Sequence, residues 1–113
     1  MPRIISYSVY ILSNQHHTVF YTGVTSDLEG RVFQHKQGEG GPFTFKYNCH
    51  CLLYYEDYTD IRNAIAREKQ LKKWRREWKL ALIQKDNPEM KDLAADWYPK
   101  FLNVQGVPGS RPG

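Results

Sequence analysis

The sequence contains no apolar run that approaches the length of a membrane-spanning helix. Its apolar start, Ile4 to Leu12, is short, is interrupted by serines and tyrosines, and lacks a small-residue cleavage pattern, so it predicts a strand rather than a signal peptide. Without an export signal, we expect a cytoplasmic protein whose two cysteines are free thiols. There is no internal repeat, and 113 residues suffice for one domain with one modest core.

Two motifs that could indicate a metal or a phosphate are incomplete. Cys49-His50-Cys51 supplies adjacent ligands but no second cysteine pair, so it does not favour a tetrahedral zinc site. The glycine cluster Gly38 to Pro42 follows a predicted helix and has no Gly-Lys-Ser/Thr ending, so it is not a phosphate-binding loop. We predict a mobile loop there instead.

Positive charge is concentrated in one segment. Residues 59–80 contain eight Lys and Arg against three Asp and Glu, whereas residues 1–58 contain four against five and residues 81–113 four against four. A clustered basic helix is typical of a nucleic-acid-binding surface. The alternative is a lysine-rich helix that is merely solvated.

Periodicity and turn residues predict the secondary structure. Alternating or continuous apolar runs between turn signals predict three strands, at Ile4–Ser13, Val19–Val24 and Cys51–Asp57. A first helix is expected from Asp27 to about Lys36, capped by Ser26 with Glu29 three residues later.

A longer helical pattern begins at Thr59 or Asp60, bends or breaks near Lys73–Arg76, and stops at Asn87-Pro88. These elements predict an α+β domain with a three-stranded antiparallel sheet flanked by helices, over residues 1–98. Residues 99–113 are rich in Gly and Pro and predict a disordered tail.

Polar side chains occupy the expected inward faces of both helices. If Leu28 and Val32 face the core, Arg31 and His35 lie on the same stripe. Glu68 repeats this anomaly on the long helix, where its face also carries the apolar residues Ile61, Ala64, Ile65 and Leu71.

Each of these residues also has a structural explanation. Tyr10 and Tyr21 could be cross-strand packing residues, His35 a core histidine, and Arg31 a surface residue. A buried carboxylate without a partner costs several kcal/mol, so Glu68 could instead form a structural salt bridge with Arg31.

Taken together, these residues resemble the GIY-YIG nuclease family. The first triad corresponds to Ser8-Val9-Tyr10 and the second to Tyr21-Thr22-Gly23. Arg31, on the first helix, follows Tyr21 by ten residues, and His35 follows Arg31 by four. Glu68 lies on the next long helix. The resemblance covers about residues 5–97 and is closest to the small stand-alone bacterial type. Some members carry a lysine after the second triad, where this sequence has Val24.

The resemblance implies a catalytic site made of Tyr10, Tyr21, Arg31, His35 and Glu68. Glu68 would be the protein ligand of Mg²⁺ or Mn²⁺, which keeps several waters and binds substrate phosphate. Arg31 would hold phosphate oxygens, and Tyr10 would position the water or Tyr21. Either Tyr21 or His35 would be the general base, and the sequence leaves that choice open.

The resemblance therefore implies a metal-dependent DNA endonuclease of low intrinsic sequence specificity, with DNA repair or recombination as a setting. Duplex or branched DNA is the expected partner, with room for a partner protein, and we expect neither a membrane nor a small-molecule cofactor. Two alternatives stay open: a non-catalytic nucleic-acid-binding module of the same fold, and a protein–protein adaptor. The residues expected to contact DNA are Arg67, Lys69, Lys72, Lys73, Arg75 and Arg76.

Overall fold

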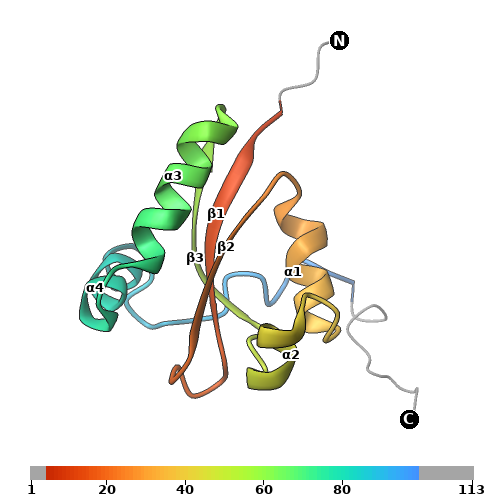
Figure 1. Cartoon of the computed structure of the whole chain (residues 1–113). Helices are drawn as coiled ribbons and strands as arrows, with labels where there is room; N and C mark the ends of the chain where they lie inside the picture. Colours follow the sequence, from red (N-terminus) through yellow and green to blue (C-terminus); the bar gives the residue numbers. More distant parts are fainter. Residues whose placement is uncertain (1–4, 100–113) are drawn as a thin grey trace.

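The computed structural model describes residues 5–99, which form a three-stranded antiparallel sheet and four helices (Figure 1). Strand order is β2-β1-β3, with both neighbouring pairs antiparallel, which confirms the predicted fold class. The elements are β1 (Tyr7–Ser13), β2 (Phe20–Thr25), α1 (Leu28–Lys36), α2 (Pro42–Tyr47), β3 (Cys51–Tyr58), α3 (Ile61–Lys72) and α4 (Arg76–Asp86).

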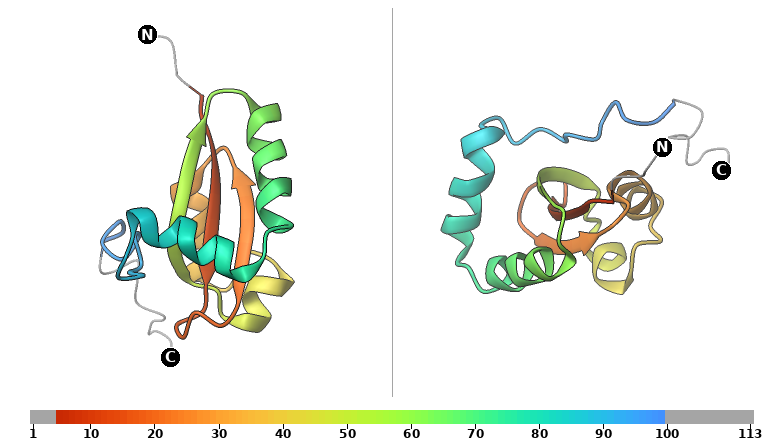
Figure 2. Two further views of the ribbon diagram at one scale, coloured as in Figure 1. Left: turned by 90° about the vertical axis from the view of Figure 1, so that its left-hand side faces the viewer. Right: turned by 90° about the horizontal axis from the view of Figure 1, so that it is seen from above.

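The sheet is covered on both faces. Helices α1 and α2 lie on one side, and α3 and α4 lie on the other (Figures 1 and 2). The central strand β1 is consequently buried from Ser8 to Ser13, including residues that point to either face. Edge strand β2 lies beside β1, between the two helical layers.

Each face of the sheet has its own hydrophobic core. On the α3 side, Val9 and Ile11 of β1 pack with Ala64, Leu71 and Ile83. On the α1 side, the alternate β1 residues Tyr10 and Leu12 pack with Val32, Leu52, Cys49 and Ala94. The period of two along β1 therefore assigns Tyr10 to the α1 side.

The strands begin and end within a few residues of their predicted positions. The first begins at Tyr7, and the predicted Ile4 lies outside the described residues. The β1–β2 turn is held by Asn14, whose side-chain oxygen accepts hydrogen bonds from the backbone N–H groups of Thr18 and Val19 at 2.8 and 3.1 Å.

Helix α1 covers the predicted segment, but its predicted cap was wrong. Asp27, not Ser26, is the N-cap residue, and its carboxylate accepts a hydrogen bond from the Gly30 N–H at 3.1 Å. Asp and Ser are comparable caps, and the local sequence allows either. The tight turn after Thr25 selects the aspartate, since its own N–H donates to the Thr25 hydroxyl at 3.0 Å.

Helix α2 is an element that the sequence did not predict. The expected loop ends at Gly41, and Pro42 begins a six-residue helix, a position where the missing proline N–H costs nothing. Asn48 ends it in the left-handed conformation, with φ of 55°. The helix is too short to show an apolar stripe, and the glycines before it dominate the local pattern.

The long helical segment divides as predicted, with α3 ending at Lys72 and α4 beginning at Arg76. Asp60 caps α3 by accepting from the Arg62 N–H at 2.9 Å. The predicted inward stripe needs a correction, because Ile61 and Ile65 are exposed. The helix is rotated so that Ala64, Glu68 and Leu71 face the sheet, which places the carboxylate toward the interior.

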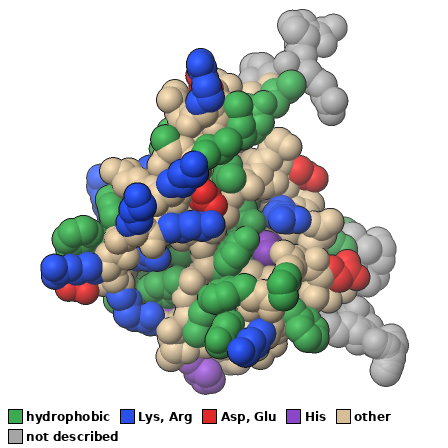
Figure 3. All heavy atoms as spheres, viewed as in Figure 1, with side chains coloured by type: hydrophobic (Ala, Val, Ile, Leu, Met, Phe, Trp, Pro, Cys, Tyr) green, Lys and Arg blue, Asp and Glu red, His purple; other side chains and the backbone are tan. Residues whose placement is uncertain are grey.

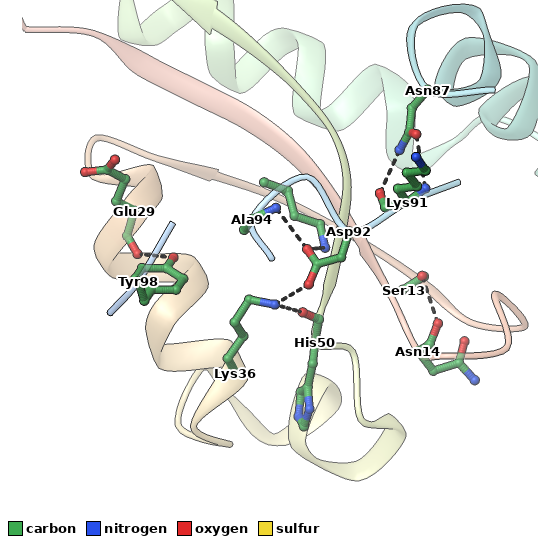
Figure 4. Close-up of polar contacts among 11 residues, drawn as sticks. Ser13, Asn14, Glu29, Lys36, His50, Asn87, Lys91, Asp92, Ala94 and Tyr98 are labelled. Carbon is green, nitrogen blue, oxygen red and sulfur yellow. Dashed lines mark hydrogen bonds and ion pairs between the residues drawn. The ribbon is translucent and has the colours of Figure 1, made fainter. Parts of the chain in front are cut away.

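Residues 88–99 fold back along β3 and α1 through hydrogen bonds that the sequence did not reveal (Figure 4). Asp92 accepts from the Leu52 and Ala94 N–H groups at 3.0 Å each and pairs with the ammonium of Lys36. Lys36 also donates to the His50 carbonyl at 2.9 Å. The predicted disordered tail lies almost entirely outside the described residues.

Asn87 stops α4 as predicted and anchors the same segment. Its amide donates to the carbonyls of Leu53 and Lys91 at 3.1 and 2.8 Å. In residues 5–99, no helix has both the length and the apolar character needed to cross a membrane.

Candidate active site

Three rings converge where β1, β2 and α1 meet. The ring centroids of Tyr10 and Tyr21 are 6.3 Å apart, those of Tyr21 and His35 are 5.6 Å apart, and those of Tyr10 and His35 are 5.9 Å apart. Tyr10 lies opposite Gly23 in the sheet, so the two tyrosines are diagonal cross-strand neighbours. His35 is 1% exposed and closes the cluster from α1.

A chain of hydrogen bonds runs inward from this cluster to α2. The hydroxyl of Tyr10 and Nε2 of His35 are 3.2 Å apart, and Nδ1 of His35 and Oγ1 of Thr44 are 3.0 Å apart. The Thr44 hydroxyl donates to the Gly41 carbonyl at 3.3 Å, so its oxygen accepts from the ring. His35 is thereby assigned the Nδ1–H tautomer, and Nε2 accepts the Tyr10 O–H.

Sequence reasoning missed Thr44. A single threonine after a glycine cluster gives no signal, because its partner His35 is nine residues away and only the fold of α2 brings them together. Gly40 is similarly placed: a Cβ there would collide with Nδ1 and the ring of His35. The predicted mobile loop therefore packs directly against the site.

Burial sets the protonation states of the cluster. Desolvation, reinforced by the positive charges of Arg31 and His50, lowers the pKa of His35 from 6.5 to about 4. Desolvation and the neighbouring Tyr21 raise the pKa of Tyr10 to about 12, against the opposing effect of Arg31. At neutral pH the imidazole is consequently neutral, and Tyr10 is protonated.

Arg31 lies at the edge of the cluster, on the turn of α1 that precedes His35. Its guanidinium donates to Gln34 Oε1 at 3.2 Å, and its charge acts on both Tyr10 and His35. It also lines a polar cavity of about 420 Å³ between the end of β2 and the start of α1. The cavity is bounded by Val24, Thr25, Ser26, Asp27, Gly30, Arg31 and Gln34.

Glu68 approaches from α3, on the other side of the sheet from α1. Its side chain is 14% exposed, and its carboxylate is 2.8 Å from the ammonium of Lys72, one helical turn further on. Glu68 is nevertheless near enough for its negative charge to contribute to the raised pKa of Tyr10. This is the smallest of the contributions to that pKa.

The structural salt bridge between Glu68 and Arg31 is not formed. Within residues 5–99, Glu68 pairs with Lys72, and Arg31 forms no ion pair. The two residues come from helices that pack on different cores of the sheet. That explanation for the two inward-facing charges does not apply.

The basic segment divides into engaged and available cations. Arg67 is held by Glu56 at 3.0 Å and lies 5.1 Å from the centroid of the Trp74 ring. Arg76 donates to the carbonyls of the β1–β2 turn and lies 4.5 Å from the ring of Phe20. These contacts tie two of the six expected DNA-binding residues to the body of the protein.

The other four cations remain at the surface. Lys69 and Lys73 are exposed and have no ion pair in the described part of the chain. Lys72 is paired with Glu68, and Arg75 lies 4.0 Å from the Glu77 carboxylate and 5.4 Å from the Trp78 ring. Lys and Arg side chains gather over α3 and its junction with α4 on the face shown in Figure 3.

The donor set was tested against a divalent cation. Among the described residues there is no group of three or more His, Cys, Asp or Glu side chains that could hold a metal ion. Glu68 alone remains, which suits Mg²⁺ because that ion keeps several waters and is often bound by one carboxylate and substrate phosphate. In this structure the Glu68 carboxylate is paired with the ammonium of Lys72, one turn further along the same helix.

Comparison with known proteins agrees with this fold. The family model of the GIY-YIG catalytic domain matches residues 6–81, and the chain belongs to the GIY-YIG family, which is of the nuclease type. The UPF0213 protein of Clostridium perfringens is 34% identical over 96 residues, covering 85% of this chain and 97% of that protein.

Other matches are also small UPF0213 proteins. One from Staphylococcus epidermidis is 38% identical over 64 residues, covering 57% of this chain and 78% of its own length. The solution structure of the Bacillus halodurans UPF0213 protein covers 81% of this chain and 98% of that one, with a TM-score of 0.51 and 22% identity. This likeness concerns the fold alone.

Proposed function

We propose that this protein is a metal-dependent DNA endonuclease that hydrolyses phosphodiester bonds with little sequence specificity of its own. The observation that carries the proposal is the convergence of Tyr10, Tyr21 and His35, with the charges of Arg31 and Glu68 both acting on Tyr10. Hydrolysis of a phosphodiester requires an oriented water, a proton acceptor and stabilisation of phosphate charge. Together these five residues offer groups for all three needs.

The Tyr21 hydroxyl is the group that would orient the attacking water. It is half-buried and has no hydrogen-bond partner within residues 5–99, so it is available to a substrate water. The Tyr10 hydroxyl is already committed to His35. The two tyrosines therefore have different roles, Tyr21 toward the substrate and Tyr10 toward the histidine.

His35 would receive the proton that the water loses. Its Nε2 is unprotonated at neutral pH, and the Tyr10 hydroxyl would pass its own proton to Nε2 as it takes one from the water. As the water oxygen bonds to phosphorus, the bond to the 3′ oxygen of the leaving strand breaks, and that oxygen takes a proton from solvent. The products are a 5′-phosphate and a 3′-hydroxyl.

The remaining residues would stabilise charge. Arg31 can donate two N–H groups to phosphate oxygens from its place at the edge of the cluster. Glu68 would hold Mg²⁺ or Mn²⁺, which when bound supplies Lewis-acid stabilisation to the phosphate and the leaving oxygen. Lys72, which pairs with this carboxylate, would be free to contact a DNA phosphate if a cation took its place.

Plasmid nicking with Mg²⁺ or with a chelator tests the proposal. We expect nicking by the parent protein only with the divalent ion, and strong loss in Glu68→Gln. Glu89→Gln is the matched control, since that glutamate is 68% exposed, lies outside the basic segment and should leave nicking unchanged. DNA binding without metal-dependent nicking would support the binding module instead, and binding to neither DNA nor RNA would support the adaptor.

A further inference from the structure

Helix α2 extends the tyrosine cluster outward as a series of aromatic rings. The ring of Tyr21 is 5.8 Å from that of Phe43, and Phe43 is 4.8 Å from Tyr47, measured between centroids. Phe43 is 43% exposed and Tyr47 is 38% exposed. Three rings therefore lead from the candidate active site onto the surface.

The exposure of these rings is not required by the fold of α2. The helix is anchored through Thr44, which is 2% exposed and bound to His35. Phe43 and Tyr47 are four residues apart, so they lie on one face of the helix, beside the anchoring residue rather than beneath it. Large apolar rings held at the surface next to an active site indicate a binding surface.

The charge around these rings suits a nucleic acid. The Lys46 ammonium lies 5.3 Å from the centroid of the Tyr47 ring. In Figure 3, hydrophobic side chains gather over α2 with a Lys or Arg among them, and the Lys and Arg side chains of α3 lie on the same face. A strand that crosses this face would meet cations at its phosphates and rings at its bases.

We propose that Phe43 and Tyr47 form a stacking platform for unpaired bases next to the scissile phosphate. In an intact duplex the neighbouring base pairs cover both faces of every base, so the platform can engage only nucleotides that are unpaired or flipped out. The preferred substrate is therefore a strand that is single-stranded beside the cleaved bond. This inference rests on the proposed endonuclease function and specifies its substrate class.

The first test measures binding of the whole protein without divalent metal, by fluorescence anisotropy. Three labelled probes of one sequence are compared. They are a single strand, the same strand in a duplex, and a single strand in which the central nucleotides are replaced by abasic sites. We expect the single strand to bind tightest and the abasic strand more weakly, because it keeps the phosphates but offers no base to stack. Equal affinity for all three probes overturns the proposal.

The second test uses variants of α2. The double variant Phe43→Ala/Tyr47→Ala should bind the single strand roughly 5- to 100-fold more weakly, the range expected for lost base–aromatic stacking. Phe45→Ala is the matched control, because Phe45 is 66% exposed on the same helix and has no ring contact with Tyr21, Phe43 or Tyr47. An equal loss in Phe45→Ala, or no loss in the double variant, overturns the proposal.

Two further measurements separate a folding defect and a failed enzyme from a failed platform. Phe43→Tyr keeps a stacking ring and should bind like the parent, which excludes a general defect of α2. If it binds as weakly as the double variant, the platform is overturned.

Cleavage of the same probes with Mg²⁺ tests the enzyme independently. Stacking-dependent binding without any cleavage would refute the endonuclease and keep the platform, whereas cleavage of duplex and single strand at equal rates would keep the endonuclease and refute the platform.

Discussion

The ring of Tyr10 lies over Gly23, its cross-strand partner, so closely that a Cβ at position 23 would be 2.5 Å from the tyrosine hydroxyl oxygen. Because Gly23 has no side chain, the Tyr10 ring can cross β2 toward Tyr21 and the edge of the sheet. The corresponding place in the first triad is occupied by Ser8, whose hydroxyl donates to Asp57 at 2.7 Å. Only one of the two triads needs a glycine in this chain.

Gly23→Ala should therefore displace Tyr10 and break its hydrogen bond to His35. Overpacking of this kind costs about 1–3 kcal/mol of stability. Nicking should fall by at least about tenfold, because the proton path to Nε2 is lost. Thermal unfolding and plasmid nicking on one preparation check both effects, and a variant with the stability and activity of the parent would show that the ring has room to move.

The buried imidazole predicts a pH dependence of stability. The pKa of His35 is lowered from 6.5 to about 4, so between these values the unfolded chain binds a proton that the folded chain does not. Its contribution is fully present above about pH 6.5 and is lost as the pH falls toward 4. Denaturant unfolding across this range checks it, with His35→Gln as the variant that should lose this component of the slope.

Thr44 should act as a positioning residue for His35. Thr44→Val keeps the shape but leaves the Nδ1–H without an acceptor, at a cost of about 1–3 kcal/mol. Without that hydrogen bond the Nδ1–H tautomer is no longer favoured, so Nε2 is less often the unprotonated nitrogen. Nicking should therefore fall. Nitrogen chemical shifts of the imidazole report the tautomer directly. Thr44→Ser restores the acceptor and should recover both the tautomer and the activity, and failure of that rescue would argue against the hydrogen bond.

Glu68→Gln should separate catalysis from stability. Its partner Lys72 is 52% exposed and four residues further on the same helix, so losing this pair should change stability by no more than about 0.5 kcal/mol. Nicking should nevertheless fall by about two to three orders of magnitude. A variant that nicks like the parent would remove Glu68 from the site, whatever its melting temperature.

The salt dependence of DNA binding should reflect the available cations rather than the whole basic segment. If Lys69, Lys72, Lys73 and Arg75 each neutralise one phosphate of duplex DNA, log affinity should fall with log salt at a slope of about −3.6. Reversing Lys69 and Lys73 to Glu should flatten the slope by about 2. Lys85→Glu, on the far part of α4, is the matched control. A slope near zero in the parent would mean that this face does not bind DNA.

The sequence by itself determined the strands, the long helices and their approximate ends. These features depend on local patterns: alternation along β1, the cap at Asp60, the break before Arg76 and the stop at Asn87. The sequence also indicated the family, because the family motif is a spacing along the chain. It is carried by two tyrosines, an arginine, a histidine and a glutamate.

Only the tertiary structure decided which of these residues touch. It placed Glu68 and Arg31 on helices that cover opposite faces of the sheet, so the two do not form an ion pair. It placed Thr44 against His35 and set the rings of α2 beside Tyr21. Such contacts join residues that are far apart in the sequence or lie on short elements without periodicity. Local sequence patterns do not predict these contacts, because they depend on how the two helical layers pack around β1.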